Sequence, residues 1–166
     1  MMRTAVLILL MLLSCPAFAQ KEILYTQRQF DSDTCCWREL ARSGRYLQGA
    51  ALIAAYLKDG KPQRRQALYW HAGQLYALGG DNSMALRYFG KTTNILYRYL
   101  GDEDARMWYF YVNGVKAFLK RDRQKLLKII SIWKRKFLGN LNYNQLLLLS
   151  EHWDMRYAEA LDLPKG

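Results

Sequence analysis

Apolar side chains recur every three or four positions from Thr34 onward, and breaks that contain glycine or aspartate separate the apolar stretches. This spacing is typical of amphipathic α-helices, whereas a half-buried strand alternates at every second residue. We find no alternating stretch that is bounded by turn residues. The pattern therefore predicts an all-α fold of seven helices, at about 34–42, 46–58, 63–78, 81–100, 102–118, 123–137 and 143–160.

The third and fourth predicted helices share a motif. Its residues are Tyr69, Ala72, Gly73, Tyr76, Gly80, Asp81, Ala85 and Phe89. Their spacing resembles the tetratricopeptide repeat, whose pattern is W-x2-L-G-x2-Y followed by A-x3-F and a proline. The best match covers 66–97, with Tyr69 in place of the tryptophan, Ala72 in place of the leucine and no closing proline. The small residues Gly73 and Ala85 would let two antiparallel helices touch.

Weaker copies of the motif flank this unit. The copy before it contains Gly44, Arg45, Tyr46, Gly49 and Ile53, and the copy after it contains Gly114, Ala117, Leu126 and Ile130. The resemblance implies three degenerate units stacked as a short solenoid of antiparallel helical hairpins, with a C-terminal helix capping the open end. An irregular helical bundle with one accidental match is the alternative.

The N-terminus has the features of a secretory signal peptide. Arg3 precedes an apolar run at 5–13, and Ala17-Phe18-Ala19 provides a cleavage site. The run is shorter than the roughly 20 residues that span a membrane, and no later stretch is apolar enough to do so. The sequence around Cys15 loosely resembles a bacterial lipobox, so lipid anchoring there is the alternative to plain secretion.

These observations predict three regions in the 166-residue chain. The signal peptide occupies 1–19, an N-terminal extended segment occupies 20–33, and a single helical-repeat domain occupies 34–166. A chain of this length can bury a hydrophobic core as one domain. The expected location is outside the cytosol, in a bacterial periplasm.

The mature region would keep two adjacent cysteines, Cys35 and Cys36. A bridge between neighbours is strained, because Cα atoms about 3.8 Å apart lie below the usual disulfide range. We therefore expect two small buried thiols, with a disulfide to another chain, a redox role or a metal role as alternatives. His71 and His152 stand alone in aromatic surroundings, so packed side chains are expected rather than metal ligands.

No motif specifies a reaction. The sequence has no G-x-S-x-G, HExxH, glycine-rich phosphate loop or CxxC pair. Glu151 and Asp154 lie on one predicted helix face, but Arg156 lies close by, which indicates a solvated surface. We therefore predict a non-enzymatic protein without catalytic residues, cofactor or metal.

Charge is distributed unevenly along the chain. Lys and Arg number 25 against 14 acids, a formal net charge of +11. A basic cluster crowds the fifth and sixth predicted helices and consists of Lys116, Lys120, Arg121, Arg123, Lys125, Lys128, Lys134, Arg135 and Lys136. Arg98 and Tyr99 add cationic and aromatic character to the fourth helix. The cluster is either a solubilising surface or a site for an anionic envelope component, such as a lipid headgroup or polymer.

The resemblance implies a second kind of partner. In solenoids of this kind the first helix of each hairpin lines a concave surface that takes a peptide or protein segment. The residues that this places on the partner surface are Trp37, Tyr69, Gln74, Trp108, Tyr111 and Asn113. The leading interpretation is therefore a protein-interaction or scaffolding subunit, and the alternative is a cationic binder of an anionic envelope component. No nucleic-acid module pattern is present, which disfavours a nucleic-acid partner.

Overall fold

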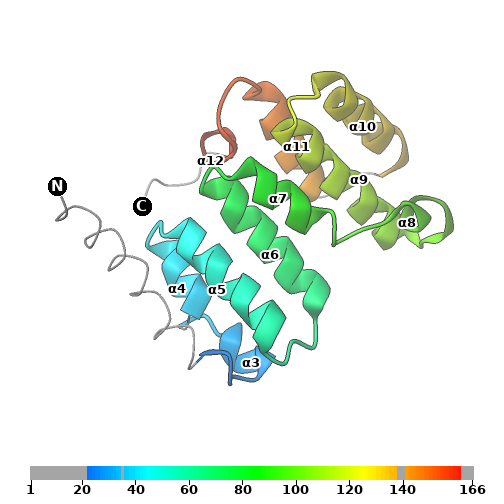
Figure 1. The fold of residues 1–166 in the computed structure, drawn as a ribbon. Helices are drawn as coiled ribbons and strands as arrows, with labels where there is room; N and C mark the ends of the chain where they lie inside the picture. Colours follow the sequence, from blue (N-terminus) through cyan, green and yellow to red (C-terminus); the bar gives the residue numbers. More distant parts are fainter. Residues whose placement is uncertain (1–21, 35, 138–140, 162–166) are drawn as a thin grey trace, which may run out of the picture.

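A computed structural model shows an all-helical fold (Figure 1). It describes residues 22–34, 36–137 and 141–161. Within these ranges the chain forms ten helices and no strand, apart from an isolated parallel bridge between Thr26 and Lys61. The predicted signal peptide and Cys15 lie outside the described residues, as does Cys35.

The helices follow one another with short connections. They are α3 (Gln27–Phe30), α4 (Cys36–Arg42), α5 (Tyr46–Asp59), α6 (Arg65–Leu78), α7 (Asn82–Phe89), α8 (Ile95–Leu100), α9 (Glu103–Leu119), α10 (Arg123–Lys136), α11 (Leu141–Glu151) and α12 (Tyr157–Ala160). Five of the predicted helices, the first three, the fifth and the sixth, are confirmed as α4, α5, α6, α9 and α10, with ends that differ by a few residues at most.

Three predictions about element bounds are wrong. The predicted helix at 81–100 is two helices, because the chain leaves α7 at Gly90 and restarts at α8, where the Asn94 side chain accepts from the Leu96 N–H. The predicted helix at 143–160 is also two, α11 and α12. The segment 20–33, expected to be extended, contains the one-turn helix α3, which Thr26 caps.

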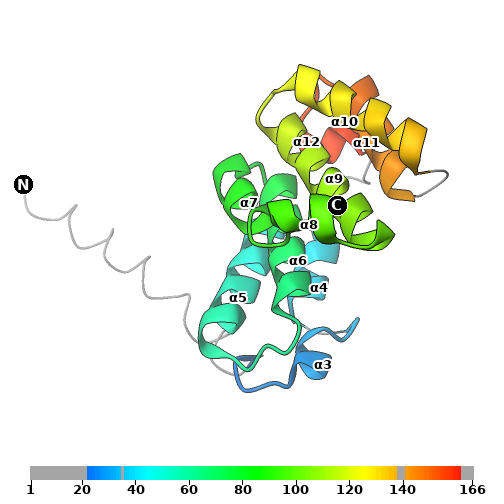
Figure 2. The ribbon, with the colours of Figure 1, turned by 90° about the vertical axis from the view of Figure 1, so that its right-hand side faces the viewer.

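Consecutive helices pack side by side, and two groups of them follow each other through the molecule. α5 packs between α4 and α6, and α6 also packs against α7. α9, α10 and α11 pack against one another, and α7 joins the two groups through α9. Figure 2 shows α9 to α12 at the opposite end of the molecule from α3. The buried core runs through both groups and includes Ile53, Phe89, Phe118 and Trp133.

The helices α4, α6 and α9 end in the same way. At each end the chain enters the left-handed region, at Gly44 (φ 72°), Gly80 (φ 84°) and Arg121 (φ 58°). The next residue donates its N–H to a carbonyl five residues back, as in Asp81 N to Tyr76 O (2.8 Å) and Asp122 N to Ala117 O (2.9 Å). This arrangement is the Schellman motif, which satisfies carbonyls that a helix end leaves free. Three helices of the fold therefore end in the same local motif.

Gly73 is small because α6 and α7 touch there. A Cβ at Gly73 would lie 2.6 Å from the Phe89 ring on α7, closer than real contacts allow. Ala85, also on α7, is fully buried. The prediction that two helices meet at the small residues of the motif is confirmed for this pair.

Candidate anion-binding surface

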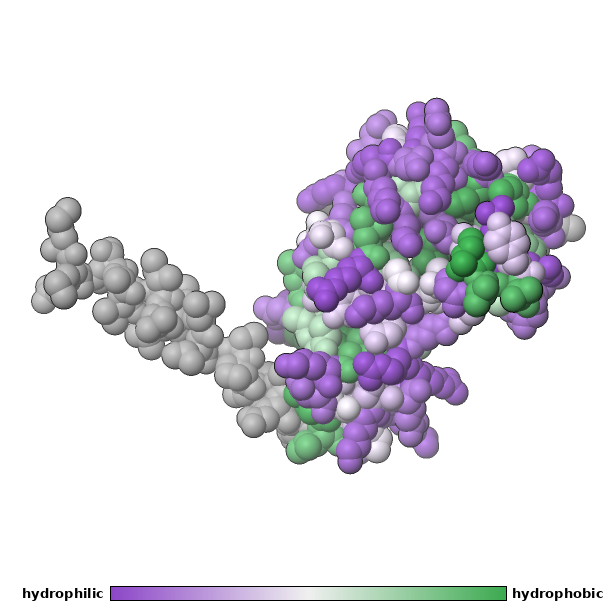
Figure 3. All heavy atoms as spheres, turned by 45° about the vertical axis from the view of Figure 1, so that its right-hand side comes forward, coloured by the Kyte–Doolittle hydropathy of each residue, from purple (hydrophilic) through white to green (hydrophobic). Residues whose placement is uncertain are grey.

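The basic cluster lies along α10, the second half of α9 and the turn between them. Its side chains are exposed except that of Lys116, which is half-buried. α10 turns Leu126, Ile129 and Trp133 toward the core, and its cations therefore occupy the outer side. Figure 3 shows the result as a hydrophilic face over α10 at the top of the molecule.

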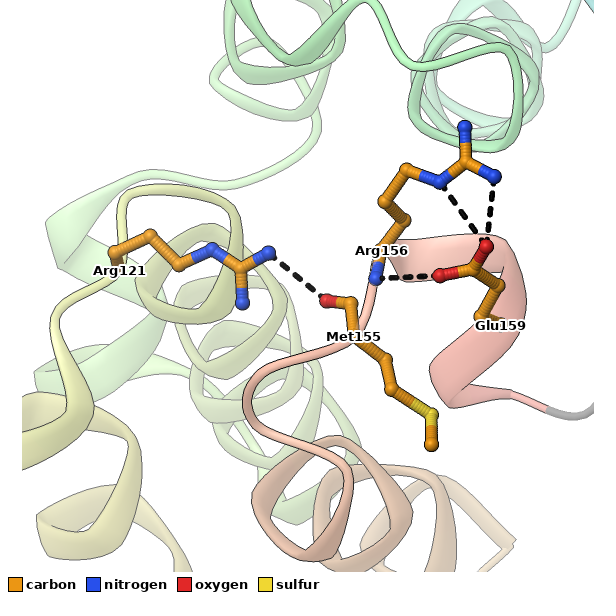
Figure 4. Close-up of polar contacts among 4 residues, drawn as sticks. All are labelled: Arg121, Met155, Arg156 and Glu159. Carbon is orange, nitrogen blue, oxygen red and sulfur yellow. Dashed lines mark hydrogen bonds and ion pairs between the residues drawn. The ribbon is translucent and has the colours of Figure 1, made fainter.

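Arg121 has a different role from the rest of the cluster. Its guanidinium donates to the Met155 carbonyl oxygen at 2.8 Å (Figure 4). It also donates to the Trp153 carbonyl oxygen and lies 5.0 Å from the centre of the Phe118 ring. It thereby holds the connection between α11 and α12 against the end of α9. We therefore omit Arg121 and the half-buried Lys116 and define the basic surface as Lys120, Arg123, Lys125, Lys128, Lys134, Arg135 and Lys136.

Carboxylates do not neutralise the basic surface within the described ranges. The ion pairs between described residues are Arg38 with Asp33, Lys58 with Asp59 and Arg156 with Glu159, the last also drawn in Figure 4. Asp122 interrupts the cluster in sequence, but its side chain accepts from the Lys125 backbone N–H and caps α10. The cations therefore face solvent as a group of one sign.

Burial and neighbouring cations both lower the pKa of Lys116. Burial lowers the pKa of the Lys116 ammonium, and the positive charges of Lys120 and Lys125 lower it further. A like charge close by disfavours the charged form of a group. The charges of Lys120 and Lys125 therefore add to the effect of burial at this edge of the basic surface.

A cavity of about 610 Å³ opens where α8, α9 and the end of α10 meet. Four exposed cations line it, Arg98, Arg106, Arg135 and Lys136, with Glu103 as the one acid. Its remaining walls are apolar or aromatic and consist of Tyr99, Phe110, Ile132 and Phe137. The arrangement suits a ligand that carries an anionic group next to an apolar part.

The sequence predicted only part of this cavity. Arg135 and Lys136 belong to the predicted cluster, and Arg98 stood out as a cation among aromatics. Arg106 was missed, because a single arginine after an acidic first turn gives no signal. The turn at Gly101 places α8 against α9 and so brings Arg98 and Arg106 to the same cavity.

The six residues predicted to bind a partner do not form one surface. Trp37 and Tyr111 are 4% and 3% exposed, so the prediction that they contact a partner is wrong for these two. Trp37 stacks on His71 and donates to Asp31 Oδ1, and the Tyr111 hydroxyl donates to Gln145. Each fills a space between neighbouring helices.

The other four residues are partly exposed and lie in different surroundings. Gln74 contacts His71 Nδ1 at 3.4 Å, and Asn113 donates to Tyr109 O of its own helix. Tyr69 lies near Tyr88 and the Lys91 ammonium, whereas Trp108 donates to Thr92 O. Trp108 also lines a cavity of about 730 Å³, together with Arg64, Arg65, Gln66 and other residues near the start of α6.

We expect His71 to make the stability of the fold depend on pH. Burial lowers its pKa most, Arg38 lowers it too, and Gln74 and Asp31 act in the opposite direction. Because the unfolded chain takes up the proton first, at a pKa of about 6.5, the free energy of unfolding should be highest above that pH and fall as pH drops through the lowered pKa. We expect urea unfolding at pH 8 and pH 5 to show a smaller pH effect in His71→Gln than in the unsubstituted protein. If the free energy of unfolding changes equally with pH in both proteins, His71 is not the source of the pH dependence.

Cys36 does not carry a free thiol. It is disulfide-bonded, and its partner lies outside the described residues. The expectation of two buried thiols is therefore wrong for Cys36, which is also only partly buried. Its φ of 61° places it among the left-handed residues.

In the part of the chain that the structure describes, no group of three or more His, Cys, Asp or Glu side chains is placed to hold a metal ion. None of the described helices has the length and apolar character needed to cross a bilayer.

Comparison of the chain with protein-family models, with curated proteins and with solved structures found no match.

Proposed function

We propose that this is an exported, non-enzymatic binding protein, located in a bacterial periplasm, that holds an anionic partner on its basic surface. The observation that carries the proposal is the run of exposed cations on α10 and the α9–α10 turn, to which no carboxylate of the described residues is paired. A protein gains little stability from such a group, since like charges repel. Binding of an anion explains why the charges are gathered on one face.

We also propose that the scaffold is a tetratricopeptide-like stack of three helical hairpins, α4 with α5, α6 with α7 and α9 with α10, closed by α11 and α12. The Schellman motif at 44, 80 and 121 supports this proposal, because it recurs at the same place in each hairpin. So does the cap that follows it in two hairpins, where Asp81 and Asp122 accept from the third N–H of α7 and α10. A stack of this kind gives α10 a rigid base.

The proposal predicts that a charge reversal on α10 weakens anion binding. We expect Lys134→Glu/Arg135→Glu/Lys136→Glu to raise the Kd for soluble polyphosphate at least about tenfold, since about 1 kcal/mol is lost per surface cation. Binding of the unsubstituted protein should weaken steeply between about 50 and 500 mM salt, because screening shortens the range of surface charges.

Arg28→Glu/Lys58→Glu/Lys61→Glu is the matched control. It changes the net charge equally at exposed positions of α3 and of the α5–α6 region. Equal loss of binding in both triple variants would show that net charge alone attracts the polyanion. Unchanged binding in the α10 variant would refute the proposed surface.

A protein segment bound at the start of α6 is the second candidate function. The cavity of about 730 Å³ favours it, because Arg64, Gln66 and Trp108 bring polar and aromatic groups together at its wall. Such binding should survive high salt and be lost on Arg64→Ala. Binding that salt abolishes and that Arg64→Ala leaves unchanged would favour the basic surface instead.

A further inference from the structure

We propose that α8 and the adjoining cationic cavity form a docking site for an anionic lipid bilayer, with a headgroup phosphate in the cavity and the apolar side chains of α8 in the acyl boundary. This inference rests on the proposed function, because it takes the anionic partner to be a membrane surface. It adds a site that the basic surface alone does not contain.

α8 exposes apolar side chains that a soluble helix would bury. None of its residues is buried, and Ile95, Leu96, Tyr99 and Leu100 are 51%, 57%, 66% and 80% exposed. They make up four of the nine large hydrophobic side chains exposed in the described part of the chain. Figure 3 shows a hydrophobic patch over α8, on the right-hand side of the molecule, with hydrophilic side chains around it. Such a patch marks an interaction site with an apolar partner.

The base of α8 is held firmly. Thr92, just before it, is 1% exposed, and its carbonyl accepts from Gln66 Nε2 (2.6 Å) and Trp108 Nε1 (3.0 Å). The Thr92 hydroxyl donates to Phe89 O at 2.8 Å. The protein therefore supports the apolar helix in its exposed position from both α6 and α9.

The cations next to the apolar patch favour a membrane with anionic headgroups. Arg98 on α8, Arg106 on α9, and Arg135 and Lys136 on α10 converge on the cavity, where Glu103 is the one acid. Interfacial helices combine apolar side chains at the acyl boundary with Lys and Arg near anionic headgroups. Each cation close to such a surface contributes attraction that falls off within a Debye length.

The same charges argue against the other occupants. A second copy of the chain would bring its own four cations against these four, and each chain carries a formal net charge of +11. An acidic protein would match the charges, but it would have to supply an apolar groove for α8 as well. A bilayer provides both an anionic layer for the cations of the cavity and an apolar layer for the exposed side chains of α8.

Vesicle flotation of the full chain tests the proposal, with every variant carrying the same N-terminal segment. The vesicles contain equal parts of phosphatidylglycerol and phosphatidylcholine, or phosphatidylcholine alone. We expect binding to the anionic vesicles to be at least about tenfold tighter. Both Leu96→Ser/Leu100→Ser and Arg98→Gln/Arg135→Gln should weaken it about tenfold. Far-UV circular dichroism checks that the variants, all at exposed positions, stay folded.

Two matched controls separate the site from general effects. Arg28→Gln/Lys61→Gln removes two exposed cations that lie outside both the cavity and the basic surface, and Leu24→Ser removes an apolar side chain that is 84% exposed elsewhere. Each should change vesicle affinity less than about threefold. Equal losses in the control and site variants would overturn the proposed site.

Soluble polyphosphate distinguishes failure of this inference from failure of the proposed function. Leu96→Ser/Leu100→Ser should bind polyphosphate normally while losing the vesicles. If it binds vesicles normally and the charge variants lose both probes, the anion-binding function stands and the bilayer site is refuted. Binding of polyphosphate without vesicle binding by the unsubstituted protein would point to an acidic protein or polymer. Binding of neither probe would refute both proposals.

Discussion

Trp133→Ala should lower the free energy of unfolding by about 3–5 kcal/mol, the range for truncating a large core aromatic. Trp133 is fully buried on α10, 5.7 Å from the Phe137 ring and 6.3 Å from the Tyr143 ring of α11. With stabilities of small domains near 5–15 kcal/mol, such a loss threatens the attachment of α10, and with it the basic surface. Urea unfolding followed by far-UV circular dichroism measures it.

Trp133→Phe is the informative comparison. Trp133 Nε1 is buried and has no hydrogen-bond partner among the described residues. A buried unsatisfied donor costs about 1–3 kcal/mol, so removing it offsets part of the lost ring contacts. We expect Trp133→Phe to cost less than about 1.5 kcal/mol, and Leu127→Ala, at a half-exposed site on the same helix, less than about 0.5 kcal/mol. Equal costs for Trp133→Ala and Trp133→Phe would contradict this account.

The sequence predicted the helices whose ends are set locally. Gly44 and Gly80 end α4 and α6 because glycine enters the left-handed region without steric cost. Asp122 begins α10 because its side chain caps the first turn. Such signals lie within a few residues of the helix end, and spacing alone was therefore enough to find them.

The missed breaks depend on residues that are distant in the chain. The interruption between α7 and α8 is held by Gln66 and Trp108, whose side chains bind the Thr92 carbonyl. The interruption between α11 and α12 involves Arg121, which binds two carbonyls of that connection. None of these three side chains could be identified as a partner from periodicity, since their contacts require the tertiary fold.

The candidate site also contains residues that the local sequence predicts and residues that only the tertiary fold brings together. Local charge density was enough to predict Arg135 and Lys136, because they are consecutive with Lys134. The cavity they share with Arg98 and Arg106 arises only when α8 folds back on α9. Burial of Trp37 and Tyr111 could not be foreseen either, because an aromatic at helical spacing faces the core or a groove according to its neighbours.

Nothing in the sequence indicated that the segment before α4 supports the rest of the fold. Gln27 shows how it does so. Its side chain is 6% exposed, and Oε1 accepts from the backbone N–H groups of Gln63 (2.7 Å) and Arg64 (2.6 Å). Nε2 donates to Asp31 Oδ2 at 3.1 Å. One glutamine thus supplies the acceptor for two donors just before α6, where no side chain of that loop caps the helix.

We expect Gln27→Ala to lower the free energy of unfolding by about 2 kcal/mol, since two N–H groups and the Asp31 carboxylate each lose a partner. Gln27→Glu keeps the acceptor oxygens but sets a second carboxylate against Asp31, so its stability should fall further at neutral pH and recover partly in acid, as protonation removes the repulsion. Gln29→Ala, an exposed position of the same short helix, removes only the Thr26 capping box and should cost about 0.5–1 kcal/mol. If urea unfolding gives the same loss for Gln27→Ala and Gln29→Ala, the segment at 22–34 is an appendage of the fold and not the support on which α6 begins.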